Sequence, residues 1–118
     1  GGGSIINLSS IAGLIGVPMT FAYTASKFDV RGMSKAGAIE LAPYNIRVNS
    51  VHPGVFRTKM NVSTPEVEKF ATAIAESMPA GRMGDPDEVA NVVLLLASDE
   101  SRFSTGAEFV VDGGWTCK

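Results

Sequence analysis

Tyr23 and Lys27 are the two side chains whose types and spacing could do chemistry together. They stand four residues apart, so on a helix they would share one face, with Cβ atoms about 6 Å apart. A free tyrosine ionises only near pH 10, whereas a neighbouring ammonium stabilises the phenolate and favours proton transfer closer to neutral pH. A hydroxyl from the preceding loop could hold a substrate oxygen in line with this pair. On its own this pair is weak evidence for a catalytic site, because most Tyr-x-x-x-Lys pairs simply lie on a solvent-exposed helix face.

The elements around this pair predict where it lies. The apolar run Ser4–Leu8 is typical of a buried strand, and a loop of small residues follows it. From about Phe21 to Ala42 no proline interrupts the chain, and Pro43 then ends the helix that we expect there. Gly32 within this helix is a poor helix former, which favours close approach of a neighbouring helix or a ligand. Tyr23 and Lys27 therefore fall in the first turns of a helix that follows a strand.

The rest of the chain continues the alternation of strands and helices. Strands are predicted over residues 46–51 and 109–111. Thr64 caps one intervening helix, and Asp85, with Glu88 three residues later, forms a capping box for a second. The order predicts an α/β layered, parallel sheet of about three strands with right-handed crossover helices. All three strands are apolar runs, so both faces of the sheet should be covered.

The composition of the chain limits the kinds of partner that we expect it to bind. The net charge is −2, the pI is about 5.3, and the ten basic residues are scattered, which argues against nucleic acid. Cys117 is the single cysteine and has no neighbours at metal-binding spacing, so neither a disulfide within the chain nor a metal site is expected. The longest apolar run, Val92–Ala97, is too short to span a bilayer. We expect a cytoplasmic protein with no membrane partner.

Five segments in order carry a specific resemblance. They are Asn7-Leu8-Ser9-Ser10, Tyr23-x-x-x-Lys27, the run Arg47–Gly54, the run Arg82–Ala90, and Val111-Asp112-Gly113-Gly114. Together they are similar to the short-chain dehydrogenase/reductase family, from the first residue to about Trp115. The resemblance implies NAD or NADP as cofactor and a small-molecule alcohol or ketone as substrate.

The resemblance also implies catalytic roles for three residues. Tyr23 would be the general acid in carbonyl reduction and the base in alcohol oxidation. Lys27 would bind the ribose hydroxyls of the nicotinamide nucleotide and favour ionisation of Tyr23. Ser10, thirteen residues before Tyr23, would hydrogen-bond the substrate oxygen.

Contacts to the cofactor and the substrate are implied at two further segments. Pro53 and Gly54 would pack near the nicotinamide, the backbone of Val55 would meet its carboxamide, and Thr58 would contact the carboxamide or the phosphates. Three apolar side chains of the covering segment could line a substrate pocket or could serve only as packing, namely Met60, Phe70 and Met78. The lone histidine, His52, is interpreted as structural, because Tyr23 already fills the acid–base role.

Other parts of the family pattern are missing from these 118 residues, above all the glycine-rich turn Thr-Gly-x-x-x-Gly-x-Gly that binds pyrophosphate. The resemblance implies a Rossmann-like, doubly wound α/β parallel sheet. We therefore interpret residues 1–118 as the carboxyl-terminal part of a single NAD(P)-binding domain, with its cofactor-binding half absent from this sequence. The opening Gly1-Gly2-Gly3-Ser4 could be a linker, but the family often has such a turn before this strand, and we interpret it so.

The hypothesis for the parent protein is reversible hydride transfer between NAD(H) or NADP(H) and a secondary alcohol/ketone pair. The stretches Val30–Lys35 and Val111–Thr116 look closest to bacterial 3α/20β-hydroxysteroid dehydrogenases, which favours a steroid or alicyclic substrate. The alternative is a fragment or a non-catalytic binding and oligomerisation module that is inactive alone. An epimerase or dehydratase is disfavoured by the context of Pro53-Gly54. The resemblance further implies a homotetramer or homodimer, with Gly32, Ala36 and Gly37 allowing close approach at the interface.

Overall fold

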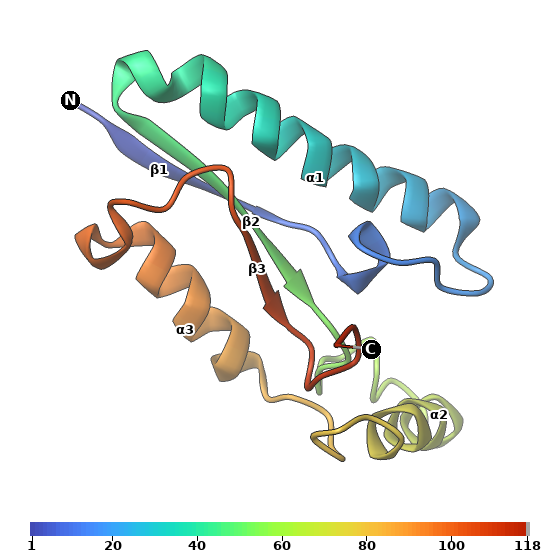
Figure 1. The fold of residues 1–118 in the computed structure, drawn as a ribbon. Helices are drawn as coiled ribbons and strands as arrows, with labels where there is room; N and C mark the ends of the chain where they lie inside the picture. Colours follow the sequence, from blue (N-terminus) through green and yellow to red (C-terminus); the bar gives the residue numbers. More distant parts are fainter. Residues whose placement is uncertain (118) are drawn as a thin grey trace.

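The computed structural model describes residues 1–117 and shows three layers (Figure 1). In these residues the sheet has the order β1-β2-β3 and is parallel throughout, with strands β1 (Gly3–Leu8), β2 (Ile46–Pro53) and β3 (Glu108–Val111). Helix α1 (Phe21–Leu41) lies on one face and α3 (Pro86–Ala97) on the other, while α2 (Pro65–Glu76) lies beyond the carboxyl end of the strands. The predicted α/β parallel sheet with crossover helices is confirmed.

The local signals in the sequence place the helix ends well. Thr64 accepts a hydrogen bond from the Val67 N–H through its Oγ1 at 3.1 Å, as expected for the cap of α2. Glu88 accepts from the Asp85 N–H at 2.9 Å, which is the reciprocal half of the predicted capping box of α3. The long helix α1 gives way at Ala42 to a 3₁₀ turn that contains Pro43.

Strand β2 is the core of the sheet because it is covered on both faces. Its residues 48–52 are all buried. Side chains alternate along a strand, and the contacts follow this rule: Val48 faces Gly37 of α1, whereas Asn49 faces the turn before β3 and donates to the Ser104 carbonyl at 2.8 Å. The prediction that apolar strands are covered on both sides is confirmed for β2.

Strand β1 is an edge strand of the described sheet. It pairs with β2 in parallel, from Gly3 opposite Ile46 to Leu8 opposite Val51, and its other side carries no strand among residues 1–117. Ile5 and Leu8 are 41% and 54% exposed. The opening glycines are part of this fold, because the Gly3 N–H donates to the Asn45 carbonyl at 3.2 Å.

One expectation about α1 needs correction. Of the three small residues expected at an interface between copies, Gly37 faces its own sheet, where an added Cβ would lie 3.7 Å from Val48. Gly32 and Ala36 lie on the exposed side. Helical periodicity explains the difference, since Gly37 follows the buried Ser34 by three residues and so shares its face.

Arg47 joins the layer of α3 to the sheet. Its guanidinium donates five hydrogen bonds of 2.9–3.2 Å, four of them to the carbonyls of Leu96, Ser98, Ser101 and Ser104. These carbonyls lie at and after the end of α3, where helical carbonyls lack partners within the helix. A cation there also complements the helix dipole. Arg47 thus fixes the end of α3 and the turn that leads into β3.

Replacing Arg47 by Met should lower the free energy of unfolding by about 2 kcal/mol, because partly buried carbonyls lose a charged donor. Urea denaturation of the full-length protein measures this difference. Arg102→Met is the matched control, since Arg102 is exposed in the same region and should change stability by less than about 0.5 kcal/mol. Equal losses in the two variants would contradict the role assigned to Arg47.

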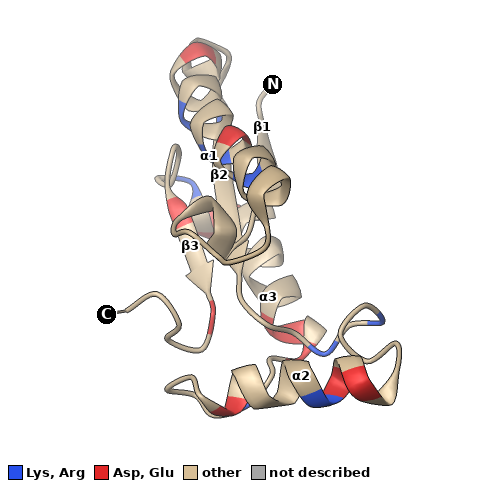
Figure 2. Cartoon of the chain, turned by 90° about the vertical axis from the view of Figure 1, so that its right-hand side faces the viewer, with Lys and Arg blue, Asp and Glu red and all other residues tan. Residues whose placement is uncertain are grey.

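Residues 1–117 contain no helix that is both long and apolar enough to span a membrane. In the cartoon of Figure 2, positions of Lys and Arg are interspersed with those of Asp and Glu along α1 and α2, whereas α3 carries only acidic residues, at its start.

Candidate active site

The predicted catalytic residues come from two neighbouring segments. Ser10 caps the short 3₁₀ turn Ile11–Gly13 that follows β1, and Tyr23 and Lys27 lie in the first turns of α1. Two contacts hold these segments together: Ser9 Oγ donates to the Lys27 carbonyl at 2.9 Å, and Lys27 Nζ lies 3.4 Å from the Leu8 carbonyl. The loop after β1 is therefore fastened to the helix that carries Tyr23.

Tyr23 and Lys27 share a helix face, as the spacing predicted. Lys27 Nζ lies 5.4 Å from the centroid of the Tyr23 ring, within cation–π range. Tyr23 is 48% exposed, and its hydroxyl makes no hydrogen bond to another of residues 1–117. No carboxylate among these residues forms an ion pair with Lys27. The hydroxyl of Tyr23 and the ammonium of Lys27 therefore remain available to a bound molecule.

Ser10 is buried, with 9% of its surface exposed. Its Oγ accepts a hydrogen bond from the Ala12 N–H at 3.1 Å. An accepting hydroxyl still has its own proton to donate. The geometry therefore leaves Ser10 able to donate one hydrogen bond to a substrate oxygen.

The predicted cofactor-contacting residues follow β2 at the same end of the sheet. Pro53 pairs with Val111 in the register, and the Gly54 N–H donates to the Val111 carbonyl at 2.9 Å. A Cβ on Gly54 would lie 2.9 Å from Asp112 Cα, so only glycine fits this junction. The backbone after β2 thus passes close to the end of β3 before it reaches Val55.

Thr58 is a buried polar group without a partner. Its Oγ1 is shielded from solvent and makes no hydrogen bond within the described part of the chain. A buried hydroxyl left unpaired costs free energy, so such groups are rare in folded proteins. Thr58 is one of the residues for which the family resemblance implies a contact to the cofactor.

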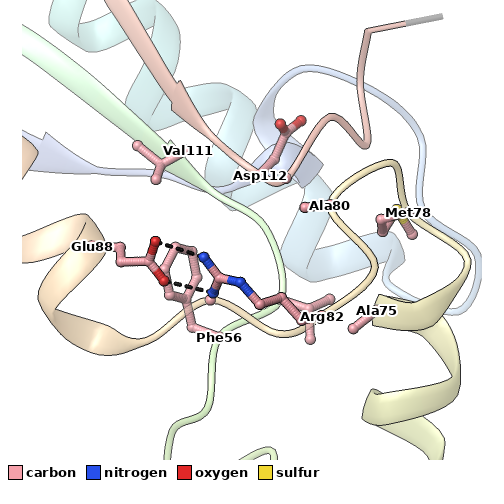
Figure 3. Close-up of a pocket in the computed structure, with 11 residues that line it drawn as sticks. Phe56, Ala75, Met78, Ala80, Arg82, Glu88, Val111 and Asp112 are labelled. Carbon is pink, nitrogen blue, oxygen red and sulfur yellow. Dashed lines mark hydrogen bonds and ion pairs between the residues drawn. The ribbon is translucent and has the colours of Figure 1, made fainter.

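The residues predicted to line the substrate are only partly brought together. Met78 lines a cavity of about 70 Å³ at the ends of β2 and β3, with Val55, Val111 and Asp112 (Figure 3). Met60 and Phe70 are 75% and 69% exposed and do not line it. Ser10, Tyr23 and Lys27 do not line it either. Ligand pockets for small molecules are several times larger, so this cavity is not an alicyclic substrate site as it stands.

An ion pair closes one side of this cavity (Figure 3). Arg82 donates to both oxygens of Glu88, at 2.7 and 2.9 Å, and the Asp85 N–H adds a third hydrogen bond to Glu88. The hydrogen bond from Arg82, then that from Asp85, lowers the pKa of Glu88 from 4.5 to about 2. The same pairing raises the pKa of Arg82.

This depressed pKa predicts a specific acid dependence of stability. A carboxylate whose pKa is lower in the folded state stabilises the fold above its unfolded-state pKa and loses that contribution as the pH falls through the folded-state value. The Tm difference between the wild type and Glu88→Gln should therefore be present at neutral pH and shrink between pH 4.5 and pH 2. The exposed Glu66 of α2 provides the control, Glu66→Gln. A Tm difference for Glu88→Gln that stays constant over this range would contradict the assignment.

His52 occupies a position that the sequence left without detail. It is fully buried at the end of β2, where Nδ1 lies 2.9 Å from the Ser10 carbonyl oxygen and Nε2 lies 2.8 Å from Ser50 Oγ. Complete burial fits the structural interpretation of this histidine. The spacing of Ser50 and His52 was a usable signal, because residues two apart on a strand face the same side.

Comparisons with known proteins agree with this arrangement. Residues 1–116 match the family model described as enoyl-(acyl carrier protein) reductase. The chain is 56% identical over 114 residues to a 3-alpha-(or 20-beta)-hydroxysteroid dehydrogenase of Mycobacterium bovis, which covers 97% of this chain and 41% of that protein. It is 47% identical over 118 residues to a cyclohexanol dehydrogenase of an Acinetobacter species, covering 100% of this chain and 45% of the relative.

A solved structure gives the same result in three dimensions. The structure of 4-hydroxyisoleucine dehydrogenase complexed with NADH superposes with a TM-score of 0.90 at 38% identity, over 98% of this chain and 47% of that one. The chain thus spans less than half of the length of each of these relatives. The family match, the sequence identities and the superposition agree over that span, and the chain belongs to the short-chain dehydrogenase/reductase family.

Proposed function

We propose that the full-length protein is an oxidoreductase that interconverts a secondary alcohol and a ketone with NAD(H) or NADP(H). The observation that carries this proposal is that Tyr23 and Lys27 lie on one helix face beside the loop of Ser10. The distance from Lys27 Nζ to the centroid of the Tyr23 ring is 5.4 Å. The names of the relatives, which are dehydrogenases of hydroxysteroids and cyclohexanol, support the same reaction class.

The chemistry assigned to each side chain follows from its hydrogen-bonding capacity. When bound, the nicotinamide supplies a hydride to the carbonyl carbon in reduction and accepts one from the alcohol carbon in oxidation. The Tyr23 hydroxyl gives its proton to the carbonyl oxygen in reduction, so that the ketone gains one hydride and one proton. Ser10 donates a hydrogen bond to the same oxygen and holds it in line. Lys27 stabilises the phenolate that remains on Tyr23.

The residues present fit a nicotinamide nucleotide at two positions. Lys27 Nζ carries three N–H groups, and its one hydrogen bond to the described chain is long, at 3.4 Å. The hydroxyl groups of a ribose could accept hydrogen bonds from the remaining N–H groups of Lys27. The unpaired Thr58 Oγ1 would be satisfied by a polar group of the cofactor, and Pro53, Gly54 and Val55 would provide the surface beside it.

The substrate we propose is an alicyclic or steroid alcohol or its ketone. Support comes from the two named relatives and from two exposed apolar side chains, Met19 and Phe21, that precede Tyr23 in the chain. Met60, Phe70 and Met78 remain proposed lining residues of the substrate site.

A direct assay tests the activity. The full-length protein is incubated with cyclohexanone or a 20-ketosteroid and either NADH or NADPH, and cofactor oxidation is followed by absorbance. We expect turnover with at least one pair, and we expect Ser10→Ala to lower kcat by about 10²-fold through loss of a donor to the reacting oxygen. Ser101→Ala is the matched control, since Ser101 is also a buried serine but lies beside Arg47. Absence of turnover with all four pairs would count against the proposal.

The competing hypothesis is a binding or oligomerisation module without turnover. The 118 residues contain no glycine-rich pyrophosphate turn, so on their own they should reduce ketones at less than about a hundredth of the full-length rate, for lack of cofactor binding. Assaying both at equal concentration measures this ratio. Comparable rates would show that the 118 residues hold a complete site.

The same proposal includes a cytoplasmic homotetramer or homodimer that associates through the exposed side of α1. Met33 and Ile39 on this helix are 60% and 78% exposed, and Gly32 and Ala36 on its exposed side leave room for a second helix. Analytical ultracentrifugation of the full-length protein measures the state of association.

A further inference from the structure

The buried side chains of His52 and Ser50 lie next to Ser10 of the proposed active site. His52 is fully buried and Ser50 is 1% exposed, and both side chains come from the carboxyl-terminal half of β2. His52 Nδ1 lies 2.9 Å from the carbonyl oxygen of Ser10, which is 42 residues away in the sequence. A side chain of the central strand is therefore bonded directly to the peptide that carries the Ser10 hydroxyl.

The partners define which ring nitrogen carries the proton. A carbonyl oxygen can only accept, so the hydrogen of the neutral ring must lie on Nδ1. Nε2 is then an acceptor, and the Ser50 hydroxyl, 2.8 Å away, donates to it. The result is a directed chain in which Ser50 donates to His52 and His52 donates to Ser10. Each bond fixes the orientation of the next group.

Both the carbonyl oxygen and the hydroxyl oxygen of Ser10 accept hydrogen bonds from neighbouring groups. Its carbonyl accepts from the His52 ring and from the Gly13 N–H at 2.9 Å, which uses both lone pairs. Its side-chain Oγ accepts from the Ala12 N–H. The bond from His52 is the one that ties Ser10 itself to the sheet rather than to its own turn. The neighbouring Ser9 N–H donates to the Val51 carbonyl at 2.8 Å and keeps the turn on β2, so loss of the His52 bond should displace Ser10 locally.

We propose that His52 is a positioning residue for Ser10, and that the Ser50–His52 pair fixes the direction in which the Ser10 hydroxyl donates. This inference rests on the proposed function, in which Ser10 bonds the reacting oxygen. A catalytic group must be held to within a fraction of an ångström, and a misplacement of about 1 Å can cost about 10²-fold in rate. His52 itself touches neither substrate nor cofactor.

Variants of His52 in the full-length protein separate positioning from packing. With cyclohexanone as the probe and the cofactor that supports turnover, His52→Leu should lower kcat by about 10- to 100-fold and leave the Kd for the reduced cofactor unchanged. His52→Asn should retain kcat within about threefold, because its amide N–H can take the place of Nδ1–H. Ser50→Ala removes only the outer bond, so its loss should be smaller than that of His52→Leu.

A double-mutant cycle with Ser10→Ala gives the sharpest test. If His52 acts through the Ser10 hydroxyl, His52→Leu should lower kcat by less than about threefold once that hydroxyl is gone. Asn49→Leu is the matched control, because Asn49 is equally buried on β2 but bonds to Ser104 and Ala107 on the other face. Its effect on kcat should be the same factor with and without Ser10→Ala.

The outcomes are distinguishable. Equal factors for His52→Leu in both backgrounds, or no rescue by asparagine, would overturn the positioning role while leaving the proposed function in place. Wild-type kcat in Ser10→Ala would overturn the proposed role of Ser10 and this inference with it. If His52→Leu does not fold, the cycle is run with Ser50→Ala, where full additivity with Ser10→Ala would overturn the inference.

Discussion

Replacing Tyr23 by Phe in the full-length protein should lower kcat for ketone reduction by about 10³-fold or more, because the reaction loses its proton donor. The hydroxyl of Tyr23 makes no hydrogen bond to the described chain, so its removal should leave the Tm unchanged within about 1 °C. The Kd for the reduced cofactor, measured by fluorescence titration, should also stay within about threefold. A loss of rate without a loss of binding or stability is the expected signature of a missing acid.

The chain provides a matched control in its other tyrosine. Tyr44 lies in the 3₁₀ turn after the far end of α1 and is 68% exposed. Tyr44→Phe removes the same oxygen from the same kind of ring and should keep the wild-type kcat. Retention of most of the rate in Tyr23→Phe, or an equal loss in both variants, would contradict the assignment of Tyr23.

Replacing Lys27 by Met should lower kcat/KM by about 10²- to 10³-fold, through a fall in kcat and a rise in the KM for the cofactor. The substitution keeps the aliphatic stem and removes the ammonium that lies 5.4 Å from the Tyr23 ring. Because one charge is assigned to both the phenolate and the ribose, both parameters should change. Steady-state kinetics with varied cofactor separates the two.

Lys35 on the same helix is the control for charge. Its ammonium pairs with Glu108 at 3.1 Å and is half exposed, so Lys35→Met should leave both kinetic parameters within about twofold of the wild type. If Lys27→Met changed kcat alone, Lys27 would not bind the ribose. If it changed the KM for the cofactor alone, Lys27 would not stabilise the Tyr23 phenolate.

Elements with strong local signals could be predicted from the sequence. Pro43 ends α1 and Asp85 with Glu88 starts α3, and both act through the backbone of adjacent residues. The pairing of Tyr23 with Lys27 is of the same kind, since helical spacing alone brings them together. Resemblance to the family then indicated Ser10, which helical spacing could not.

Contacts over long sequence separations could not be predicted in this way. The bond between His52 and Ser10 spans 42 residues, and the bonds of Arg47 to the end of α3 span 49 to 57. Each depends on how strands and helices stack, which local patterns do not specify. The facing of Gly37 toward Val48 was missed for a related reason, because small size fits a helix interface and a helix–sheet contact equally well.

We propose that this fold places Tyr23 and Lys27 where a hydride from the cofactor reaches the carbonyl carbon of the substrate. This proposal is tested most directly by isotope transfer in the full-length protein, with cyclohexanone and reduced cofactor carrying deuterium at the transferable position. Mass spectrometry of the product should show one deuterium on the carbinol carbon in ordinary water, and none on that carbon when unlabelled cofactor is used in heavy water. Cyclohexanol without deuterium from the labelled cofactor, or with solvent deuterium on the carbinol carbon, would contradict hydride transfer at this site.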